Sequence, residues 1–257
     1  MTVNDVYSFI EQIASFKMQE SYDNSGFLIG DKTAQVTKIC LCLDITLDVV
    51  EEAKKKGANL IISHHPVIFK PIRGITGKSP VREMIKSDIN AICVHTNADV
   101  AFMGDVMLEK LGFSPSREAV EVINSEGAGF GRIATSHEFI SPAELAFRCK
   151  KAFNSPSVRY VDGKKFVSRV GICSGAGGDC FAFAVENNCH AFITGEVKHS
   201  LLVEAKNLGI TLIEAGHFST EVIFCDFLKN KICERFTELA EDAIFTAESA
   251  VDICKYI

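Results

Sequence analysis

Histidine and acidic side chains recur in four short segments of this sequence. The segments read ISHHPVIF, VHTNAD, ITGEVKHS and EAGHFSTE, and they hold five of the seven histidines. Their candidate functional side chains are His64, His65, His95, Asp99, Glu196, His199, His217 and Glu221. Imidazole and carboxylate are the ligand set of zinc, iron, manganese and related divalent ions. The four segments therefore predict a metal site.

The spacing within two segments adds detail to this prediction. His217 and Glu221 are four residues apart at the start of a predicted helix, so both can reach one ion from the same face. His64 and His65 are adjacent, and successive side chains diverge at the end of a strand. Two ions with a bridging carboxylate would use both histidines. Paired ions roughly 3.5–4 Å apart are typical of hydrolases, where they activate water.

A structural interpretation competes with the metal site. A histidine after a strand is commonly an ordinary hydrogen-bonding residue, and H-x-x-x-E on a helix occurs by chance. The joint pattern of four such segments favours a metal site. His137 and His190 lie outside the segments and are interpreted as surface or satisfied residues. The ten cysteines contain no C-x-x-C and favour small buried hydrophobes in a reducing compartment, with a zinc or disulfide framework as the alternative.

Each of the four segments follows an apolar run typical of a strand, and helical patterns separate the runs. Strands are expected at 37–43, 59–63, 90–95, 157–161, 166–173, 191–194 and 211–215, with two more around the glycine-rich turn within 118–139. Helices are expected at 4–16, 46–56, 79–87, 104–111, 141–153, 178–187, 197–208 and from 219. This alternation predicts mostly parallel sheets flanked by helices. Ligands bind at the carboxyl ends of such strands, where all four segments lie.

We expect two α/β lobes, because the alternation changes near residues 113–130. The first lobe is assigned to residues 1–125 and carries the HHP and HTNxD segments. The second is assigned to residues 126–257 and carries the TGE and GHxxTE segments, with a C-terminal helix able to pack back on the first lobe.

Composition and charge exclude several classes of protein. The chain has 257 residues and a formal net charge of −6, which disfavours a nucleic-acid partner bound through a broad basic surface. No apolar run approaches the length that crosses a bilayer, so no membrane partner is expected. The N-terminus lacks the cationic and apolar regions of a signal peptide, and we expect a cytoplasmic protein.

Five motifs in order, SYDNSGFLIGD, ISHHPVIF, VHTNAD, ITGE and EAGHFSTE, resemble the NIF-three-like family, often named GTP cyclohydrolase 1 type 2 homologues. The resemblance runs nearly end to end and matches the shorter form of the family, which has no inserted central domain. It implies the NIF-three-like fold, with two α/β lobes and a dinuclear metal site between them. It also implies self-assembly into a homohexameric toroid.

The resemblance also implies roles for individual residues. His64 is similar to a ligand of one ion and His65 to a ligand of the other. Asp99 would join the ion of His65, His217 the ion of His64, and Glu221 would bridge both. His95 is similar to a histidine beside the metals, either supporting a ligand or helping in catalysis. Tyr22 and Ser200 depart from the family pattern, where Trp and a second His are frequent.

The function expected from the residues and the resemblance is metal-dependent hydrolysis of a nucleotide or another phosphate-containing small molecule. His95 or Glu196 would act as general acid or base. His199, Asp23 and Asn24 would contact the substrate, although Asp23 and Asn24 could also only shape a turn. The two divalent ions could be zinc, iron, manganese, nickel or cobalt. The alternative is a non-catalytic metal-binding protein: a store, a chaperone or insertase, or a regulatory scaffold.

Two further features are expected to support the site. Asp44 ends the CLCLD strand and could accept a hydrogen bond from a metal-binding histidine. GICSGAGGD runs from a strand through a glycine-rich turn into a helix. It lacks the ending of a P-loop, so it is interpreted as a tight strand–helix turn, with a phosphate site as the alternative.

Overall fold

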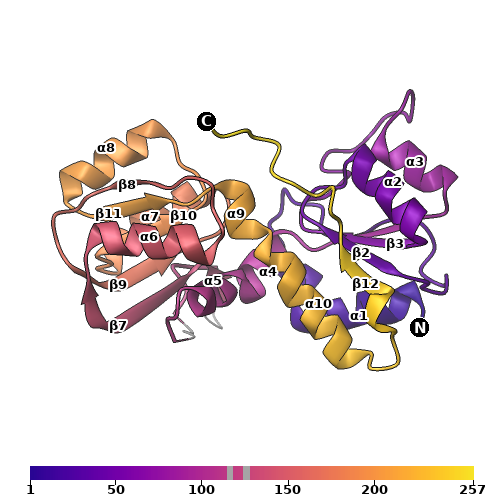
Figure 1. Ribbon diagram of the computed structural model, residues 1–257, viewed down its shortest axis with the longest axis horizontal. Coiled ribbons are helices and arrows are strands. Elements are labelled where there is room, and N and C mark those ends of the chain that lie inside the picture. Colours follow the sequence, from indigo (N-terminus) through magenta and orange to yellow (C-terminus); the bar gives the residue numbers. More distant parts are fainter. Residues whose placement is uncertain (115–117, 124–127) are drawn as a thin grey trace. The chain divides into compact units, whose positions relative to one another are not determined.

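The computed structural model describes residues 1–114, 118–123 and 128–257, which form two compact units (Figure 1). The first unit comprises residues 1–101 and 224–253, and the second comprises residues 102–223 with the last four residues of the chain. The lobe boundary expected after residue 125 falls within 124–127, outside the described residues.

The first unit is built on a five-stranded sheet with the order β1-β4-β3-β2-β12. Its strands are β1 (Gly26–Ile29), β2 (Ile39–Cys42), β3 (Leu60–Ser63), β4 (Asn90–Cys93) and β12 (Ile244–Thr246). All neighbouring pairs are parallel except β1 with β4. Cys42 pairs with Ser63, and Ser63 pairs with Cys93, so β2, β3 and β4 end level with one another. The segments that follow these strands therefore start from one edge.

Helices cover both faces of this sheet, as the alternation predicted. The helices are α1 (Val3–Ile13), α2 (Leu47–Lys56), α3 (Pro80–Lys86) and α10 (Ile223–Arg235), which belongs to this unit from Phe224 onward. α2 and α3 pack on the face of Cys40, Ile61 and Ala91, and α1 and α10 lie on the other side (Figure 1). The strands are buried on both faces, which explains why they read as continuous apolar runs.

Local signals set the ends of these helices. Thr46 caps α2 by accepting a hydrogen bond from Val49 N, and Gly57 ends it in the left-handed conformation, with φ 76°. The N-cap of α1 is Thr2, which forms a capping box with Asp5.

The second unit contains a five-stranded mixed sheet with the order β7-β9-β10-β11-β8. Its strands are β7 (Arg132–Ile140), β8 (Arg159–Val161), β9 (Val167–Ile172), β10 (Ala191–Thr194) and β11 (Thr211–Glu214). The central three, β9, β10 and β11, are parallel, and β7 and β8 pair with them in the antiparallel sense. A short hairpin, β5 (Glu121–Val122) and β6 (Gly129–Phe130), forms a separate pair.

The helices of the second unit lie within a few residues of the ranges expected from the sequence, except that the helix expected from residue 219 is divided into α9 and α10. They are α5 (Gly104–Lys110), α6 (Pro142–Ala152), α7 (Phe181–Glu186), α8 (His199–Leu208) and α9 (His217–Glu221). Ser141 caps α6 by accepting a hydrogen bond from Glu144 N, with Pro142 at the first position of the helix. α7 and α8 pack on the sheet through a core that includes Phe181, Phe192 and Leu212. The predicted α/β fold, with mostly parallel sheets flanked by helices, is confirmed.

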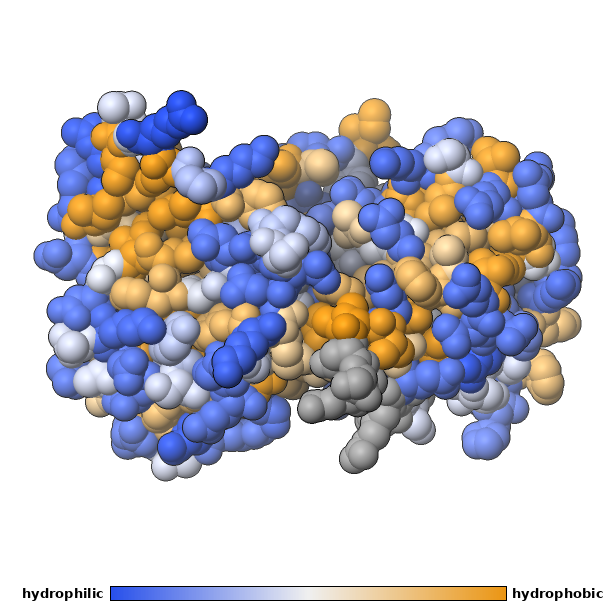
Figure 2. Space-filling model, turned by 180° about the vertical axis from the view of Figure 1, so that it is seen from behind, coloured by the Kyte–Doolittle hydropathy of each residue, from blue (hydrophilic) through white to orange (hydrophobic). Residues whose placement is uncertain are grey.

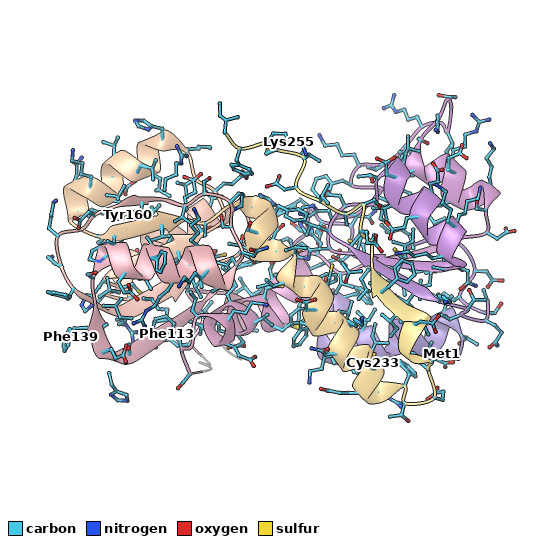
Figure 3. The ribbon with its side chains drawn as sticks, viewed as in Figure 1. Met1, Phe113, Phe139, Tyr160, Cys233 and Lys255 are labelled. Atoms are coloured by element: carbon cyan, nitrogen blue, oxygen red, sulfur yellow. The ribbon has the colours of Figure 1, made fainter. Side chains whose placement is uncertain are left out.

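Eight of the ten cysteines are buried, and Cys233 and Cys254 are exposed. Phe139 and Tyr160 project from the second unit with 74% and 41% of their surface exposed (Figure 3).

Hydrophilic side chains are spread over the face shown in Figure 2, among hydrophobic areas. Among the described residues, no helix combines the length and apolar character required to cross a bilayer.

Candidate metal site

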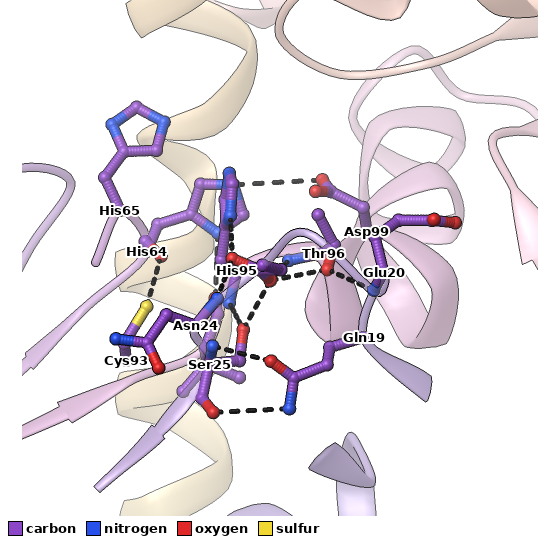
Figure 4. Close-up of polar contacts among 12 residues, drawn as sticks. Gln19, Glu20, Asn24, Ser25, His64, His65, Cys93, His95, Thr96 and Asp99 are labelled. Carbon is purple, nitrogen blue, oxygen red and sulfur yellow. Dashed lines mark hydrogen bonds and ion pairs between the residues drawn. The ribbon is translucent and has the colours of Figure 1, made fainter. Parts of the chain in front are cut away.

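Three histidines of the first unit gather at the carboxyl edge of its sheet (Figure 4). His64 and His65 follow β3, and His95 follows β4. One ring nitrogen of each histidine lies within 4.8 Å of one ring nitrogen of both others. The ring centroids are 5.2–5.4 Å apart. The structure thus brings together three of the residues that the sequence singled out.

Each of the three rings is held through Nδ1 by an oxygen acceptor. His64 Nδ1 lies 2.9 Å from the Val94 carbonyl oxygen, and His65 Nδ1 lies 2.8 Å from Asp44 Oδ1. His95 Nδ1 lies 2.8 Å from Asp23 Oδ1. An oxygen of this kind can only accept, so Nδ1 carries the proton and Nε2 carries the lone pair in the neutral ring. This is how proteins prepare histidines to bind a metal.

Asp44 therefore holds a histidine of the doublet, as the sequence predicted. Val94 was not singled out, because a carbonyl acceptor has no side-chain signal in the sequence.

Asp99 adds a carboxylate to the histidine cluster. Its Oδ1 lies 3.8 Å from His64 Nε2 (Figure 4), so the structure places Asp99 beside His64, whereas the resemblance assigns it to the ion of His65. Asp99 begins a π-helical turn (Asp99–Met103) that follows the short helix α4 (Thr96–Ala98), and such turns are frequent at functional sites. In the same motif, Asn97 is buried and donates to the Ala14 carbonyl at the end of α1. The HTNxD motif thus supplies two side chains to the cluster, His95 and Asp99, and one that packs the fold, Asn97.

Asp23 is the buried acceptor of this cluster, with 0% of its side chain exposed. Besides His95, it accepts hydrogen bonds from the Thr96 backbone N–H, the Thr96 hydroxyl and the Ser25 hydroxyl. Burial alone would raise the pKa of Asp23, but the hydrogen bonds from His95 and Thr96 outweigh it and hold the pKa well below its usual range. We expected Asp23 and Asn24 to contact the substrate. Asn24 Nδ2 donates to the Ile68 carbonyl, and the Asp23 carboxylate faces inward.

In the second unit, one helical turn carries the other predicted ligands. His217 and Glu221 lie on α9, with His217 Nε2 2.9 Å from Glu221 Oε2. Glu196, which follows β10, places Oε1 3.2 Å from His217 Nδ1. The hydrogen bond with Glu221, followed by the contact with Glu196, raises the pKa of His217 to about 9 against the opposing effect of burial. The predicted H-x-x-x-E pair is therefore formed.

A glycine leaves room for the Glu221 carboxylate. A Cβ added to Gly175 would lie 1.9 Å from Glu221 Oε1 and 3.4 Å from His217 Nε2. In each unit the candidate donors are imidazole nitrogens and carboxylate oxygens, which suit a divalent cation. The space at Gly175 and the oxygen acceptors of the histidine Nδ1 atoms also suit a metal site, because both hold the donor atoms in place before an ion binds.

The glycine-rich turn uses two of its backbone N–H groups for hydrogen bonds within the second unit. Gly175 N donates to the Thr220 hydroxyl and Gly177 N donates to the Thr194 hydroxyl, both at 3.1 Å. These two N–H groups are used inside the protein, which favours the tight-turn interpretation over a phosphate cradle. Neither threonine was singled out from the sequence. Their local signal is that each stands inside a candidate segment, Thr194 in ITGEVKHS and Thr220 in EAGHFSTE.

A surface cavity of about 700 Å³ lies beside Glu196 in the second unit. Its walls include Ala176 and Gly178 of the turn, and Lys198 and Ser200. His199, which we expected to bind substrate, is the first residue of α8 and is exposed. A cavity of this volume accommodates a small molecule.

Comparison with known proteins identifies the family. A family model described as Duf34/NIF3 (NGG1p interacting factor 3) matches residues 1–250. A Clostridium perfringens protein named GTP cyclohydrolase 1 type 2 homolog is 31% identical over 242 residues, covering 91% of this chain and 92% of the relative. A Campylobacter jejuni protein of the same name is 34% identical over 234 residues, covering 89% and 90%.

Solved structures agree with this assignment. The crystal structure of Staphylococcus aureus hypothetical protein SA1388 matches with a TM-score of 0.90 and 28% identity, over 100% of this chain and 99% of that one. A Bacillus cereus protein related to NIF3 also reaches 0.90, over 100% and 99%, and at 19% identity it supports the fold alone. The sequence resemblance is thus confirmed, and this chain belongs to the Duf34/NIF3 family.

Proposed function

We propose that this protein binds divalent metal ions and uses them in a hydrolytic reaction. One observation carries the proposal. His64, His65 and His95 each have Nδ1 held by an oxygen acceptor, and one ring nitrogen of each lies within 4.8 Å of those of the others. Three imidazoles held this way are pre-organised donors, which an ordinary strand end does not require.

The ligands in this proposal are His64, His65 and Asp99 of the first unit and His217 and Glu221 of the second. The contacts within each unit support it: His64 Nε2 with Asp99 at 3.8 Å, and His217 Nε2 with Glu221 at 2.9 Å. A cation between such donors would replace these direct contacts. Two ions per chain, with Glu221 as the bridging ligand, follow from the family resemblance.

The metal ions would supply a water nucleophile at neutral pH and stabilise developing negative charge. His95 is the proposed general acid or base, because Asp23 fixes its tautomer and leaves the Nε2 lone pair to take a proton. Glu196 is the second candidate for this role. It is 56% exposed and lines the cavity, while it also orients His217 through Nδ1.

The proposed substrate is a nucleotide or another phosphate-containing small molecule. The names of the relatives, GTP cyclohydrolase 1 type 2 homolog, support this class. The cavity beside Glu196 offers Lys198 as a cation for a negatively charged substrate. The remaining charged side chains of the cavity wall are Asp179, Glu196 and the Arg159–Glu214 ion pair. Substrate binding there would depend on Lys198 for its electrostatic attraction.

Metal content tests the proposal directly. The untagged protein, purified without chelator, is measured by elemental mass spectrometry beside His64→Ala, Glu221→Gln and the control His137→Ala. His137 is exposed on β7 and outside the predicted ligands. We expect about two ions per chain in the wild type and the control, with a marked loss in the two ligand variants. A wild type that takes up no zinc, iron, manganese, nickel or cobalt contradicts the proposal.

The catalytic part is tested separately, by incubating the metal-loaded protein with GTP, other nucleotides and phosphoesters. Turnover that is lost in His95→Gln, while metal content is retained, supports hydrolysis with His95 as acid or base. Stable metal binding with no turnover on any of them favours the alternative of a store, insertase or scaffold.

We also propose that the chain self-assembles, as the family resemblance implies. Light scattering of the purified protein measures the mass in solution. A homohexamer would have six times the chain mass of 28.1 kDa, and a monomer at all concentrations contradicts assembly.

A further inference from the structure

The carboxylate of Glu221 occupies space that any side chain at residue 175 would fill. An added Cβ at Gly175 would lie 1.9 Å from Glu221 Oε1 and 2.8 Å from Glu221 Cδ. Non-bonded atoms do not approach this closely. Only 6% of the Glu221 side chain is exposed, so the carboxylate has little room to move aside. Residue 175 therefore determines whether Glu221 can lie against His217.

The carbonyl oxygen of Gly175 is the centre of a hydrogen-bond network. It accepts from Gly195 N at 2.9 Å, from Glu196 N at 3.0 Å and from the Thr194 hydroxyl at 3.1 Å. This network ties the turn after β9 to the end of β10. The position of Glu196, the residue that contacts His217 Nδ1, depends on it.

The amide of Gly175 connects the same turn to α9. Gly175 N donates to the Thr220 hydroxyl at 3.1 Å, and that hydroxyl lies 2.9 Å from the Gly216 carbonyl and 3.0 Å from the His217 carbonyl. Thr220 is fully buried and adjacent to Glu221. Its hydroxyl therefore links the glycine turn to the first turn of the helix that carries both candidate ligands.

We propose that Gly175, with the hydroxyls of Thr194 and Thr220, is the positioning element of the second-unit ligands. Gly175 provides the space for the Glu221 carboxylate. The two hydroxyls bond to the backbone of Gly175 and so keep the turn in the position that leaves this space open. The inference rests on the proposed metal-binding function, which it deepens. It assigns a purpose to the glycine-rich turn, which the ligand set itself does not use.

The main test compares Gly175→Ala with Gly209→Ala. Both glycines have positive φ, 56° and 66°, so alanine introduces similar backbone strain at each. An added Cβ at Gly209 would meet its nearest atom at 3.7 Å, an ordinary contact. Both glycines lie in the second unit. We expect Gly175→Ala to weaken zinc binding by ~10–100-fold, and Gly209→Ala to bind zinc like the wild type.

A second pair of variants separates positioning from folding. Thr220→Ser keeps the hydroxyl, and Thr220→Val keeps the shape and removes it. We expect Thr220→Val to lose zinc affinity by about tenfold, and Thr220→Ser to restore most of it. Thermal unfolding of the metal-free proteins identifies a variant that has merely failed to fold. Equal zinc affinity in the Ser and Val variants would overturn the role of the hydroxyl.

A metal-independent measurement decides the inference even if the proposed function fails. The crystal structure of metal-free Gly175→Ala should show Glu221 displaced from its 2.9 Å contact with His217. A wild type that binds no metal refutes the proposed function, while this structure still tests positioning. Metal binding by Gly175→Ala equal to that of Gly209→Ala, with Glu221 unmoved, overturns the positioning inference alone.

Discussion

Replacing Asp23 with asparagine places one amide where two carboxylate oxygens now accept hydrogen bonds. Oδ1 faces His95 Nδ1 and the Asn24 backbone N–H, and Oδ2 faces the Thr96 N–H. If the new NH₂ group replaces Oδ2, the Thr96 N–H meets a donor. If it replaces Oδ1, His95 must move its proton to Nε2, because Nδ1 would have to accept. Either orientation breaks one part of the network.

The size of the effect follows from the burial of Asp23. Its side chain is fully buried, so a donor left facing a donor cannot turn to water. Losing a buried hydrogen bond to a charged acceptor costs about 1.5–3 kcal/mol. For a chain of this size, about 1 kcal/mol corresponds to a shift of roughly 2–4 °C in Tm. We therefore expect Asp23→Asn to lower Tm by roughly 3–12 °C.

Two assays follow the two orientations. Urea unfolding measures the free energy of unfolding, and nitrogen NMR of the metal-free protein reports which ring nitrogen of His95 carries the proton. Asp31→Asn is the control, because Asp31 accepts from the Thr33 N–H and hydroxyl in an exposed turn. We expect a much smaller change there. Unchanged stability in Asp23→Asn, together with a proton that stays on His95 Nδ1, would refute the reasoning.

Three other perturbations have defined outcomes. Burial alone would raise the pKa of Glu52, but hydrogen bonds from Lys56 and Ser249 outweigh it and lower the pKa to about 2 from 4.5. Ionised Glu52 thus stabilises the fold above pH 4.5, by at most ~3 kcal/mol. This contribution is lost as the pH falls toward 2. When the free energy of unfolding is measured against pH, Glu52→Gln should therefore lose less stability between pH 4.5 and 2 than the wild type does. The same loss in both proteins would contradict this. Phe224 is fully buried with its ring 5.2 Å from that of His64, and Phe224→Ala should cost ~3–5 kcal/mol in urea unfolding. A loss below about 1 kcal/mol would show that the site has collapsed to fill the space. Chelator should lower the Tm of the metal-loaded protein and leave that of Glu221→Gln nearly unchanged, because only bound metal adds stability; equal shifts in both would count against Glu221 as a ligand.

Most of the elements were predictable because their signals are local. The caps at Thr46 and Ser141 and the left-handed Gly57 lie within a few residues of the helices they delimit. Continuous apolar runs identified β2, β3, β4, β10 and β11, since strands buried on both faces have no polar side. The same reasoning located the ligand segments, because parallel strands present their following residues at one edge.

Two edge strands were missed. β1 lies in GFLI, inside the motif SYDNSGFLIGD, where the sequence analysis expected no strand, and β12 is only Ile244–Thr246. Both are short, and what makes them strands is pairing: β1 with β4, and β12 with β2. The β12–β2 pair joins residues about two hundred positions apart, such as Ile244 and Ile39. No local pattern reports a partner at that distance.

The sequence by itself determined which side chains could bind a metal and which strands would carry them, because residue type and hydrophobic periodicity are properties of short stretches of sequence. Only the tertiary structure decided how those side chains are held. Asp23 reaches His95 across 72 positions, and Gly175 meets Thr220 across 45. The identity of a hydrogen-bond acceptor, or of a glycine that makes room for a carboxylate, is a property of the packed fold. It exists only once distant segments have been brought within a few ångströms of each other.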